Sequence, residues 1–168
     1  HTPNQPVLIA FGGLDSFKDE LWFMVGRGAL QRGISVLLVD GPGQGGTLRR
    51  LGIPTRFDYE VPVGACIDWL AKRNDVDMSR IAVSGSSLGG YYATYLAERF
   101  PQLDFRVALV NPAVRPYALL ANFLGLQKNI YTGDVYELTA RHIDELKALE
   151  VETISPSRYL LVTRTGDE

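Results

Sequence analysis

The sequence has little cysteine and little histidine, and each scarcity excludes a class of chemistry. Its one cysteine, Cys66, excludes an intramolecular disulfide framework and a cysteine-rich zinc site. Its two histidines, His1 and His142, leave little material for a histidine-based metal site and limit acid–base chemistry near neutral pH. We therefore expect no metal site.

The chain also lacks a strong charge and a long apolar run. Its formal net charge is -2, which gives no reason to expect nucleic acid or an anionic membrane as a partner. No apolar stretch approaches the ~18 residues that a membrane span needs, and no signal peptide is visible. Hydrophobic residues make up 46% and charged residues 21%, which is ordinary globular composition. We expect a cytoplasmic protein that binds neither a membrane nor nucleic acid.

The two ends of the chain suggest an excerpt from a longer protein. The sequence starts at His1 without an initiator Met, and it stops at Glu168 directly after an apolar run. Natural domains rarely end on the residues that follow a core strand. The 168 residues suit one domain with a sizeable core. We interpret residues 1–168 as a single core domain that lacks a C-terminal element.

Short apolar runs alternate with amphipathic stretches along the chain. Five runs are apolar on both faces, which is typical of parallel strands covered on both sides: 7–11, 34–40, 80–84, 106–111 and 158–163. Three stretches between them have helical spacing: 17–32, 63–73 and 88–100. This alternation predicts an α/β fold with a mostly parallel sheet and helices on both faces.

Residues 113–156 interrupt the alternation. Two helical stretches, 117–124 and 135–150, are joined by a polar turn around residues 128–133. Such an insertion is either a small helical lid or an ordinary pair of surface helices, and the sequence leaves both open.

The third strand leads into a motif that carries chemistry, Gly85-Ser86-Ser87-Leu88-Gly89, and a helix follows at once. G-x-S-x-G between a strand and a helix predicts a sharp turn that exposes a serine nucleophile, here Ser87. The flanking glycines remove side chains that would clash where strand and helix meet. Ser86 is the neighbouring alternative but lacks this spacing. The other interpretation of the motif is a turn kept only for close packing.

A nucleophilic serine also needs donors for the developing oxyanion. One should be the backbone N–H of Leu88, the residue after the nucleophile, and the dipole of the following helix favours negative charge there. The second should come from the loop after the first strand, residues 12–15, where we choose the N–H of Leu14. The same loop can be interpreted as a helix start, because Ser16 and Asp19 have capping-box-like spacing, and both interpretations can hold together.

A second glycine-rich segment, residues 41–46, formally matches G-x-G-x-x-G and is followed about twenty residues later by Glu60. A dinucleotide site needs a helix that begins inside the glycines. Pro42 interrupts this segment, and Gly52-Ile53-Pro54 leaves no sustained helix after it. We therefore reject nucleotide binding.

These motifs together resemble the α/β-hydrolase superfamily, and different parts of the chain resemble two of its branches. Residues 7–93 resemble the FrsA-like and 2,6-dihydroxypseudooxynicotine hydrolase type, through Gly12-Gly13-Leu14-Asp15-Ser16, Asp40-Gly41-Pro42-Gly43-Gln44-Gly45 and Ile67-Asp68-Trp69-Leu70. Residues 84–168 resemble YqiA-like esterases, through Ser86-Ser87-Leu88-Gly89-Gly90-Tyr91-Tyr92-Ala93-Thr94, Val110-Asn111-Pro112-Ala113-Val114-Arg115-Pro116, Tyr131-Thr132-Gly133, Arg141-His142-Ile143 and Thr165-Gly166-Asp167-Glu168.

The resemblance implies a Ser–Asp–His triad in that chain order. It assigns the nucleophile to Ser87 and the acid to Asp167, in the loop after the last strand, although Asp167 can also be a plain turn residue. The histidine of the family lies beyond the acid and is therefore absent from these 168 residues. His142 precedes the acid on a polar stretch, so we interpret it as a solvated or lid histidine.

We conclude from the sequence that the chain is the core of a serine hydrolase for carboxylic esters or thioesters. No metal or organic cofactor is implied. The competing class is a non-catalytic α/β-hydrolase scaffold that is used for binding or is inactive for want of the histidine. Apolar side chains in the insertion either favour an apolar acyl group or simply pack on the sheet: Leu119, Leu120, Phe123 and Leu124.

Overall fold

The computed structural model describes residues 4–113, 115–129, 133–147, 150–151 and 153–163. By its internal contacts the chain divides into two units. The first comprises His1–Ala113 and Thr153–Glu168, and the second, Val114–Glu152, is inserted into it.

The first unit is built on a five-stranded sheet in the order β2-β1-β3-β4-β7, and every pairing in it is parallel. The strands are β1 (Gln5–Phe11), β2 (Ser35–Val39), β3 (Val76–Ser87), β4 (Arg106–Pro112) and β7 (Tyr159–Val162). All five predicted strands are confirmed, and β3 is longer than predicted because its pairing with β1 begins at Val76 and its pairing with β4 continues to Ser87.

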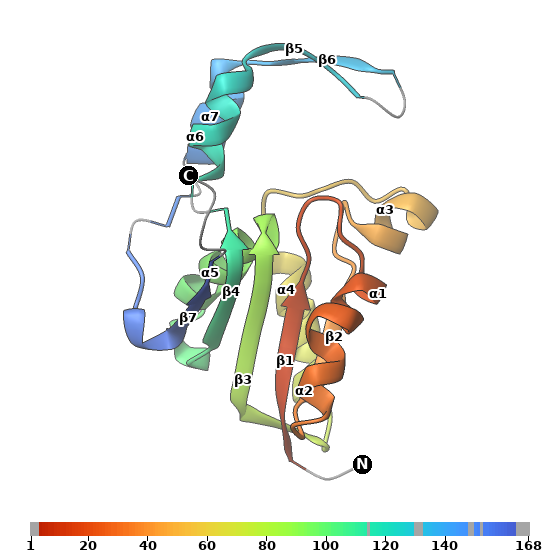
Figure 1. Cartoon of the computed structure of the whole chain (residues 1–168), viewed down its shortest axis with the longest axis vertical. Helices are drawn as coiled ribbons and strands as arrows, with labels where there is room; N and C mark the ends of the chain where they lie inside the picture. Colours follow the sequence, from red (N-terminus) through yellow and green to blue (C-terminus); the bar gives the residue numbers. More distant parts are fainter. Residues whose placement is uncertain (1–3, 114, 130–132, 148–149, 152, 164–168) are drawn as a thin grey trace. The chain divides into compact units, whose positions relative to one another are not determined.

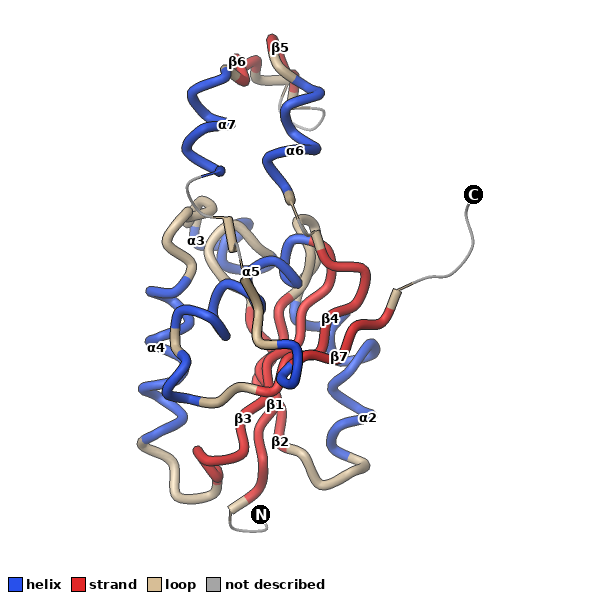
Figure 2. Tube along the Cα trace, turned by 90° about the vertical axis from the view of Figure 1, so that its left-hand side faces the viewer, coloured by secondary structure: helices blue, strands red, loops and turns tan. Residues whose placement is uncertain are grey.

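Helices cover both faces of this sheet, as predicted. One continuous helical stretch consists of α1 (Lys18–Leu21), a π-helical turn η1 (Trp22–Gly26) and α2 (Arg27–Leu30). The other main helices are α4 (Glu60–Ala71) and α5 (Leu88–Arg99), and short 3₁₀ turns η2 (Pro101–Leu103) and η4 (Pro156–Arg158) precede β4 and β7. Figure 2 shows α2 and α4 on opposite sides of the strands.

The hydrophobic core lies between the sheet and the pair α4 and α5. Alternate residues of β1 point into it, and β3 and β4 add further apolar side chains. The largest fully buried members are Tyr59, Phe11, Phe105, Ile9 and Leu96. Burying an aliphatic or aromatic side chain of this size stabilises the fold by about 1.5–3 kcal/mol. The core therefore holds rigid the strands from which the functional loops leave.

The carboxyl ends of the central strands meet at one edge of the sheet, where Figure 1 shows the arrowheads of β1, β3 and β4. Phe11, the last residue of β1, pairs with Val39 on one side and with Gly85 on the other. The loops after β1 and β2 and the turn after β3 consequently start at the same level. Ligands of parallel α/β sheets bind at this edge.

The prediction that no sustained helix follows the second glycine-rich segment is wrong. Residues Gly45–Leu51 form α3, which ends at Gly52 in the left-handed region (φ 67°). The helix starts despite Pro42 because the carboxylate of Asp40 accepts the N–H of Gly46. A hydrogen bond between two residues six apart in the sequence thus supplies the cap that the residues next to the helix start do not provide.

The second unit contains α6 (Pro116–Leu120), a 3₁₀ turn η3 (Ala121–Phe123), β5 (Gly125–Lys128), β6 (Val135–Leu138) and α7 (Ala140–Lys147). The prediction of one helix over 135–150 is wrong in its first part, because Val135–Leu138 pairs antiparallel with Gly125–Lys128. The predicted first helix, 117–124, is present as α6 and η3. A role of this unit as a lid stays a prediction.

No helix among the described residues is long and apolar enough to cross a membrane.

Candidate active site

Ser87 lies at the sharp turn where β3 passes directly into α5. Its side chain is exposed, and its backbone has φ 50° and ψ −121°, a conformation that residues with a side chain rarely adopt. Holding such a backbone costs about 1–3 kcal/mol, and this kind of strain concentrates at functional sites. Ser86, the alternative, stays in β3 opposite Val110 and is half-buried. The geometry therefore exposes Ser87, and not Ser86, at this turn.

The two glycines of the motif are needed because backbones meet here. A Cβ added at Gly85 would overlap the carbonyl oxygen of Gly89. A Cβ added at Gly89 would overlap the carbonyl of Gly12 and lie 2.7 Å from the carbonyl oxygen of Phe11. The turn after β3 is thus packed against the end of β1 without room for a methyl group.

The loop after β1 lies beside Ser87. A Cβ added at Gly13 would be 3.2 Å from the Cβ of Ser87 and 3.8 Å from its Oγ. The next residue, Leu14, carries an exposed side chain. Leu88 is the first residue of α5, so its N–H has no acceptor within the helix. The two amides chosen as oxyanion donors, those of Leu14 and Leu88, therefore belong to segments that flank the serine.

Gln44 joins the loop after β1 to the loop after β2. Its side chain is only 6% exposed. Its Nε2 donates hydrogen bonds to the carbonyl oxygens of Gly12, at 3.0 Å, and Gly13, at 2.8 Å, and its Oε1 accepts one from the hydroxyl of Tyr59, at 3.0 Å. The amide thus holds the loop that carries Leu14.

Tyr59 connects Gln44 to α5, the helix that follows Ser87. Its ring stacks on that of Tyr92 in α5, with centroids 3.9 Å apart and planes 5° apart. Burial raises the pKa of the Tyr59 hydroxyl well above its usual range, and the neighbouring Tyr92 adds to this. The hydroxyl therefore stays protonated and keeps its role as donor to Gln44.

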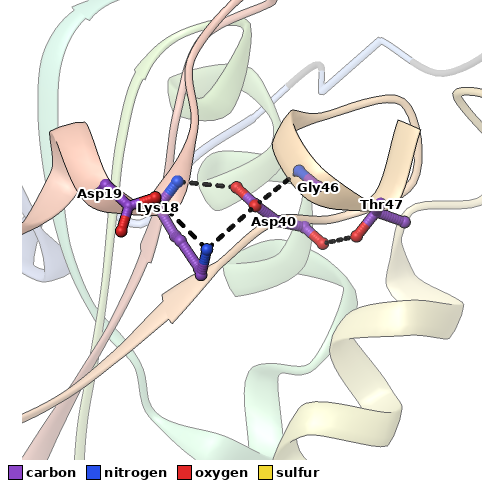
Figure 3. A network of polar contacts seen from close by, with 5 residues as sticks. All are labelled: Lys18, Asp19, Asp40, Gly46 and Thr47. Atoms are coloured by element: carbon purple, nitrogen blue, oxygen red, sulfur yellow. Dashed lines mark hydrogen bonds and ion pairs between the residues drawn. The ribbon is translucent and has the colours of Figure 1, made fainter. Parts of the chain in front are cut away.

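Asp40 ties two helix starts to the end of β2 (Figure 3). Its Oδ1 accepts the backbone N–H of Lys18, the first residue of α1, at 2.7 Å, and its Oδ2 accepts that of Gly46 in α3 at 2.9 Å. The hydroxyl of Thr47 donates to its backbone carbonyl at 2.6 Å. The Nζ of Lys18 adds an ion pair at 3.7 Å. One carboxylate thereby caps both helices, where the dipoles favour negative charge.

This arrangement revises two sequence interpretations. Ser16 does not cap the helix, because its hydroxyl donates to the carboxylate of Glu20 and Asp40 caps α1 instead. The expectation that residues 41–46 bind no nucleotide loses one premise and stays a prediction. The helix α3 does begin inside the glycines, yet the carboxylate of Asp40 already occupies the N-terminus where a pyrophosphate would bind.

Asp167, the proposed acid, lies outside the described residues, as does His1. His142 belongs to the second unit, where its Nδ1 accepts the backbone N–H of Thr139 at 3.0 Å, just before α7. It therefore stabilises the start of a helix. Among the residues that the structure describes, no group of three or more His, Cys, Asp or Glu side chains could hold a metal ion.

Sequence reasoning missed the roles of Asp40, Gln44 and Tyr59. The signal was present in the segment Asp40-Gly41-Pro42-Gly43-Gln44-Gly45, which we interpreted as a false nucleotide motif. Glycines around one long amide side chain mark a place where backbone and side chain pack closely. A Cβ added at Gly41 would indeed overlap the hydroxyl of Tyr59.

Comparison with known proteins identifies relatives of this chain. A family model described as an uncharacterised protein family (UPF0227) matches residues 68–168, more than half of the chain. The hydrolyase poxO of Penicillium oxalicum is 46% identical over 94 residues, which are 52% of this chain and 22% of that protein. The α/β hydrolase gkaG of Penicillium citrinum is 42% identical over 95 residues, 53% of this chain and 22% of that protein. The matched region is thus about a fifth of these relatives' length.

Solved structures extend the comparison. The 2,6-dihydroxy-pseudo-oxynicotine hydrolase is 34% identical with a TM-score of 0.57, covering 66% of this chain and 30% of that one. Est1E from Butyrivibrio proteoclasticus is 16% identical with a TM-score of 0.62, covering 96% of this chain and 68% of that one, and shows the fold alone. The predicted α/β-hydrolase fold and the resemblance to both branches are confirmed.

Proposed function

Because this chain belongs to the uncharacterised protein family UPF0227 and has the α/β-hydrolase fold, we propose that it is part of a serine hydrolase that cleaves carboxylic esters or thioesters. The observation that carries the proposal is the backbone of Ser87 (φ 50°), held exposed at the strand–helix turn beside the loop of Gly13. The named hydrolases among its relatives support the reaction class.

In the proposed reaction, Oγ of Ser87 attacks the carbonyl carbon and loses its proton to a general base. The carbonyl oxygen becomes an oxyanion and accepts hydrogen bonds from the N–H groups of Leu88 and Leu14. Collapse of the tetrahedral intermediate breaks the bond to the alcohol or thiol, which takes the proton from the base. Water then attacks the acyl-enzyme with help from the same base, and the carboxylic acid leaves.

The base is the part that these residues do not supply. We place it in a histidine outside the 168 residues, oriented by Asp167, because His142 is engaged with Thr139 at the start of α7. The stretch matched to the relatives named above is 22% of their length. Activity should therefore be measured on the full-length protein.

The substrate is expected to be a small ester or thioester. Leu119, Phe123 and Leu124 of the second unit expose 50% or more of their surface, and Leu120 is half-buried. An influence of these side chains on the acyl preference stays a prediction, which hydrolysis rates over a series of p-nitrophenyl esters of increasing acyl length test.

The proposal is tested by hydrolysis of p-nitrophenyl esters and an acyl thioester by the full-length protein and its Ser87→Ala variant. Removing the nucleophile of a serine hydrolase lowers kcat by roughly 10⁶-fold, so we expect Ser87→Ala to fall to background. Ser86→Ala is the matched control, since it removes the adjacent hydroxyl, and it should keep turnover. Equal rates for wild type and Ser87→Ala would refute the proposal and favour the non-catalytic scaffold.

A further inference from the structure

Gln44 is buried and uses every polar atom of its amide. The two N–H bonds of Nε2 are directed to the carbonyl oxygens of Gly12 and Gly13, and Oε1 accepts the hydroxyl of Tyr59. A buried amide whose hydrogen bonds are all made contributes more to stability than its packing alone. Loss of one partner would leave a buried polar group without a hydrogen bond.

Gln44 holds two consecutive peptide planes of the loop after β1. In a trans peptide the C=O and the next residue's N–H point in opposite directions. Fixing the carbonyl of Gly12 therefore fixes the N–H of Gly13, and fixing the carbonyl of Gly13 fixes the N–H of Leu14. Both N–H groups are directed away from Gln44. The second is the amide that the proposed function uses for the oxyanion.

The loop needs such a restraint because its own sequence gives little. Two glycines in succession leave the backbone free to rotate. The carbonyl of Gly13 also accepts the N–H of Ser16, but this bond is long, at 3.3 Å. The side chains of Leu14 and Asp15 are exposed. Gln44 supplies the two short contacts to this loop.

The two carbonyl oxygens, which can only accept, decide which way the amide of Gln44 faces, and Tyr59 completes this arrangement. The hydroxyl of Tyr59 donates to Oε1, so a rotated amide would lose that bond and also point Oε1 at the two carbonyl oxygens. The stack of Tyr59 on Tyr92 anchors this donor to α5, the helix that begins after the nucleophile. The loop after β1 and Ser87 are thus both held by contacts with α5.

We propose that Gln44 is the positioning residue of the oxyanion hole, and that Tyr59 acts through it. This inference rests on the proposed function. Gln44 does not touch the substrate; it aims the amide of Leu14. Since an oxyanion forms only in the transition state, loss of that aim lowers kcat and leaves KM nearly unchanged.

The experiment uses the full-length protein with a p-nitrophenyl ester. Gln44→Met keeps the length of the side chain and removes the donors, and Gln44→Glu removes the donors but keeps an acceptor for Tyr59. Tyr59→Phe keeps the ring stack and removes one hydroxyl. Tyr92→Phe is the matched control, because it removes the hydroxyl of the other stacked ring, which is not bonded to Gln44. The Tm of each variant is measured in parallel.

Complete loss of an oxyanion donor costs about 10²–10³-fold in kcat, so a misdirected donor should cost less. We expect kcat to fall about 50-fold in Gln44→Met and Gln44→Glu and about fivefold in Tyr59→Phe, with KM within about twofold. Tyr92→Phe should keep kcat. In a double-mutant cycle, adding Tyr59→Phe to Gln44→Met should change kcat no further, because Tyr59 acts only through Gln44.

Three results would overturn this role: an unchanged kcat in Gln44→Met, a rise in KM at constant kcat, or multiplicative effects in the cycle. If Gln44→Met does not fold, Tyr59→Phe decides, and an unchanged kcat there refutes the role. Ser87→Ala separates the two proposals. Wild type no faster than Ser87→Ala overturns both, whereas fast wild type with equally fast Gln44 variants overturns the role of Gln44 alone.

Discussion

Polar side chains differ between the carboxyl ends of the strands of the five-stranded sheet, here called the carboxyl edge, and their amino ends, the amino edge. At the carboxyl edge, Gln44 is 6% exposed and the side chain of Asp40 is 10% exposed, and both bind backbone groups of neighbouring loops. At the amino edge, Arg73 pairs with Asp75 and Arg80 with Asp77, with side chains 21–54% exposed. One edge uses buried polar groups to fix backbone, and the other uses exposed ion pairs that water screens.

The difference indicates which end of the sheet is held more rigidly. Exposed ion pairs are weak because water competes for both partners. Buried hydrogen bonds to backbone hold a fixed geometry and are costly to break. The carboxyl edge is therefore preorganised, as the proposed oxyanion hole would require.

The sharpest way to break the carboxyl edge is to add a methyl group where backbones meet. Gly89→Ala places a Cβ against the carbonyls of Gly12 and Phe11, which cannot move without shifting β1. We expect a loss of about 3 kcal/mol in the free energy of unfolding. Gly64→Ala is the control, because a Cβ there meets nothing within 4 Å, and it should stabilise α4 by about 0.5–1 kcal/mol. Urea unfolding measures both. Equal effects would contradict the close approach at Gly89.

The next largest effect should come from Asp40. Asp40→Ala removes the cap of α1 and of α3 together and leaves two backbone N–H groups without their acceptor, which should cost about 2 kcal/mol. Asp40→Asn keeps one acceptor oxygen and should cost less. Asp19→Ala is the control, since Asp19 is exposed and contacts only the Lys18 ammonium in the same network. Thermal unfolding compares the three, and an Asp40→Ala Tm equal to that of Asp19→Ala would refute the double cap.

The smallest effect is expected at the amino edge. The hydroxyl of Ser79, with the Arg80 guanidinium, lowers the pKa of Asp77 from its usual value of 3.8 to about 2. The folded state therefore favours ionised Asp77, so its contribution to stability is present above about pH 4 and is lost as the pH falls toward 2. Asp77→Asn should lower Tm slightly at pH 7, and its difference from wild type should shrink as the pH falls from 4 and vanish below about pH 2. A difference that grows as the pH falls would contradict this sign.

The sequence predicted the parts of the fold that depend on local pattern. The five strands are apolar on both faces. The glycines of the motif around Ser87 predict the sharp turn between strand and helix. The hairpin in the second unit was missed because Val135 and Leu138 are spaced i, i+3, which a helix also favours, and only pairing with Gly125–Lys128 decides between them.

The parts of the site that were missed depend on contacts between loops. The cap of α3 comes from Asp40, before the glycine-rich turn, and the restraint on Gly12 and Gly13 comes from Gln44, about thirty residues away in sequence. No periodicity reports such contacts. A long amide side chain among glycines is the only sign of these contacts in the sequence. Its role can be recognised only once the register of β1 and β2 places both loops at the same end of the sheet.

The most direct test of the central claim is covalent labelling of the full-length protein with a fluorophosphonate, followed by intact mass and peptide mapping. The serine displaces fluoride and its Oγ becomes bonded to phosphorus. The account predicts one adduct, on Ser87, and none in Ser87→Ala. A folded wild-type protein that takes up no label, or that carries it on Ser86, would contradict the claim that this turn presents a catalytic serine.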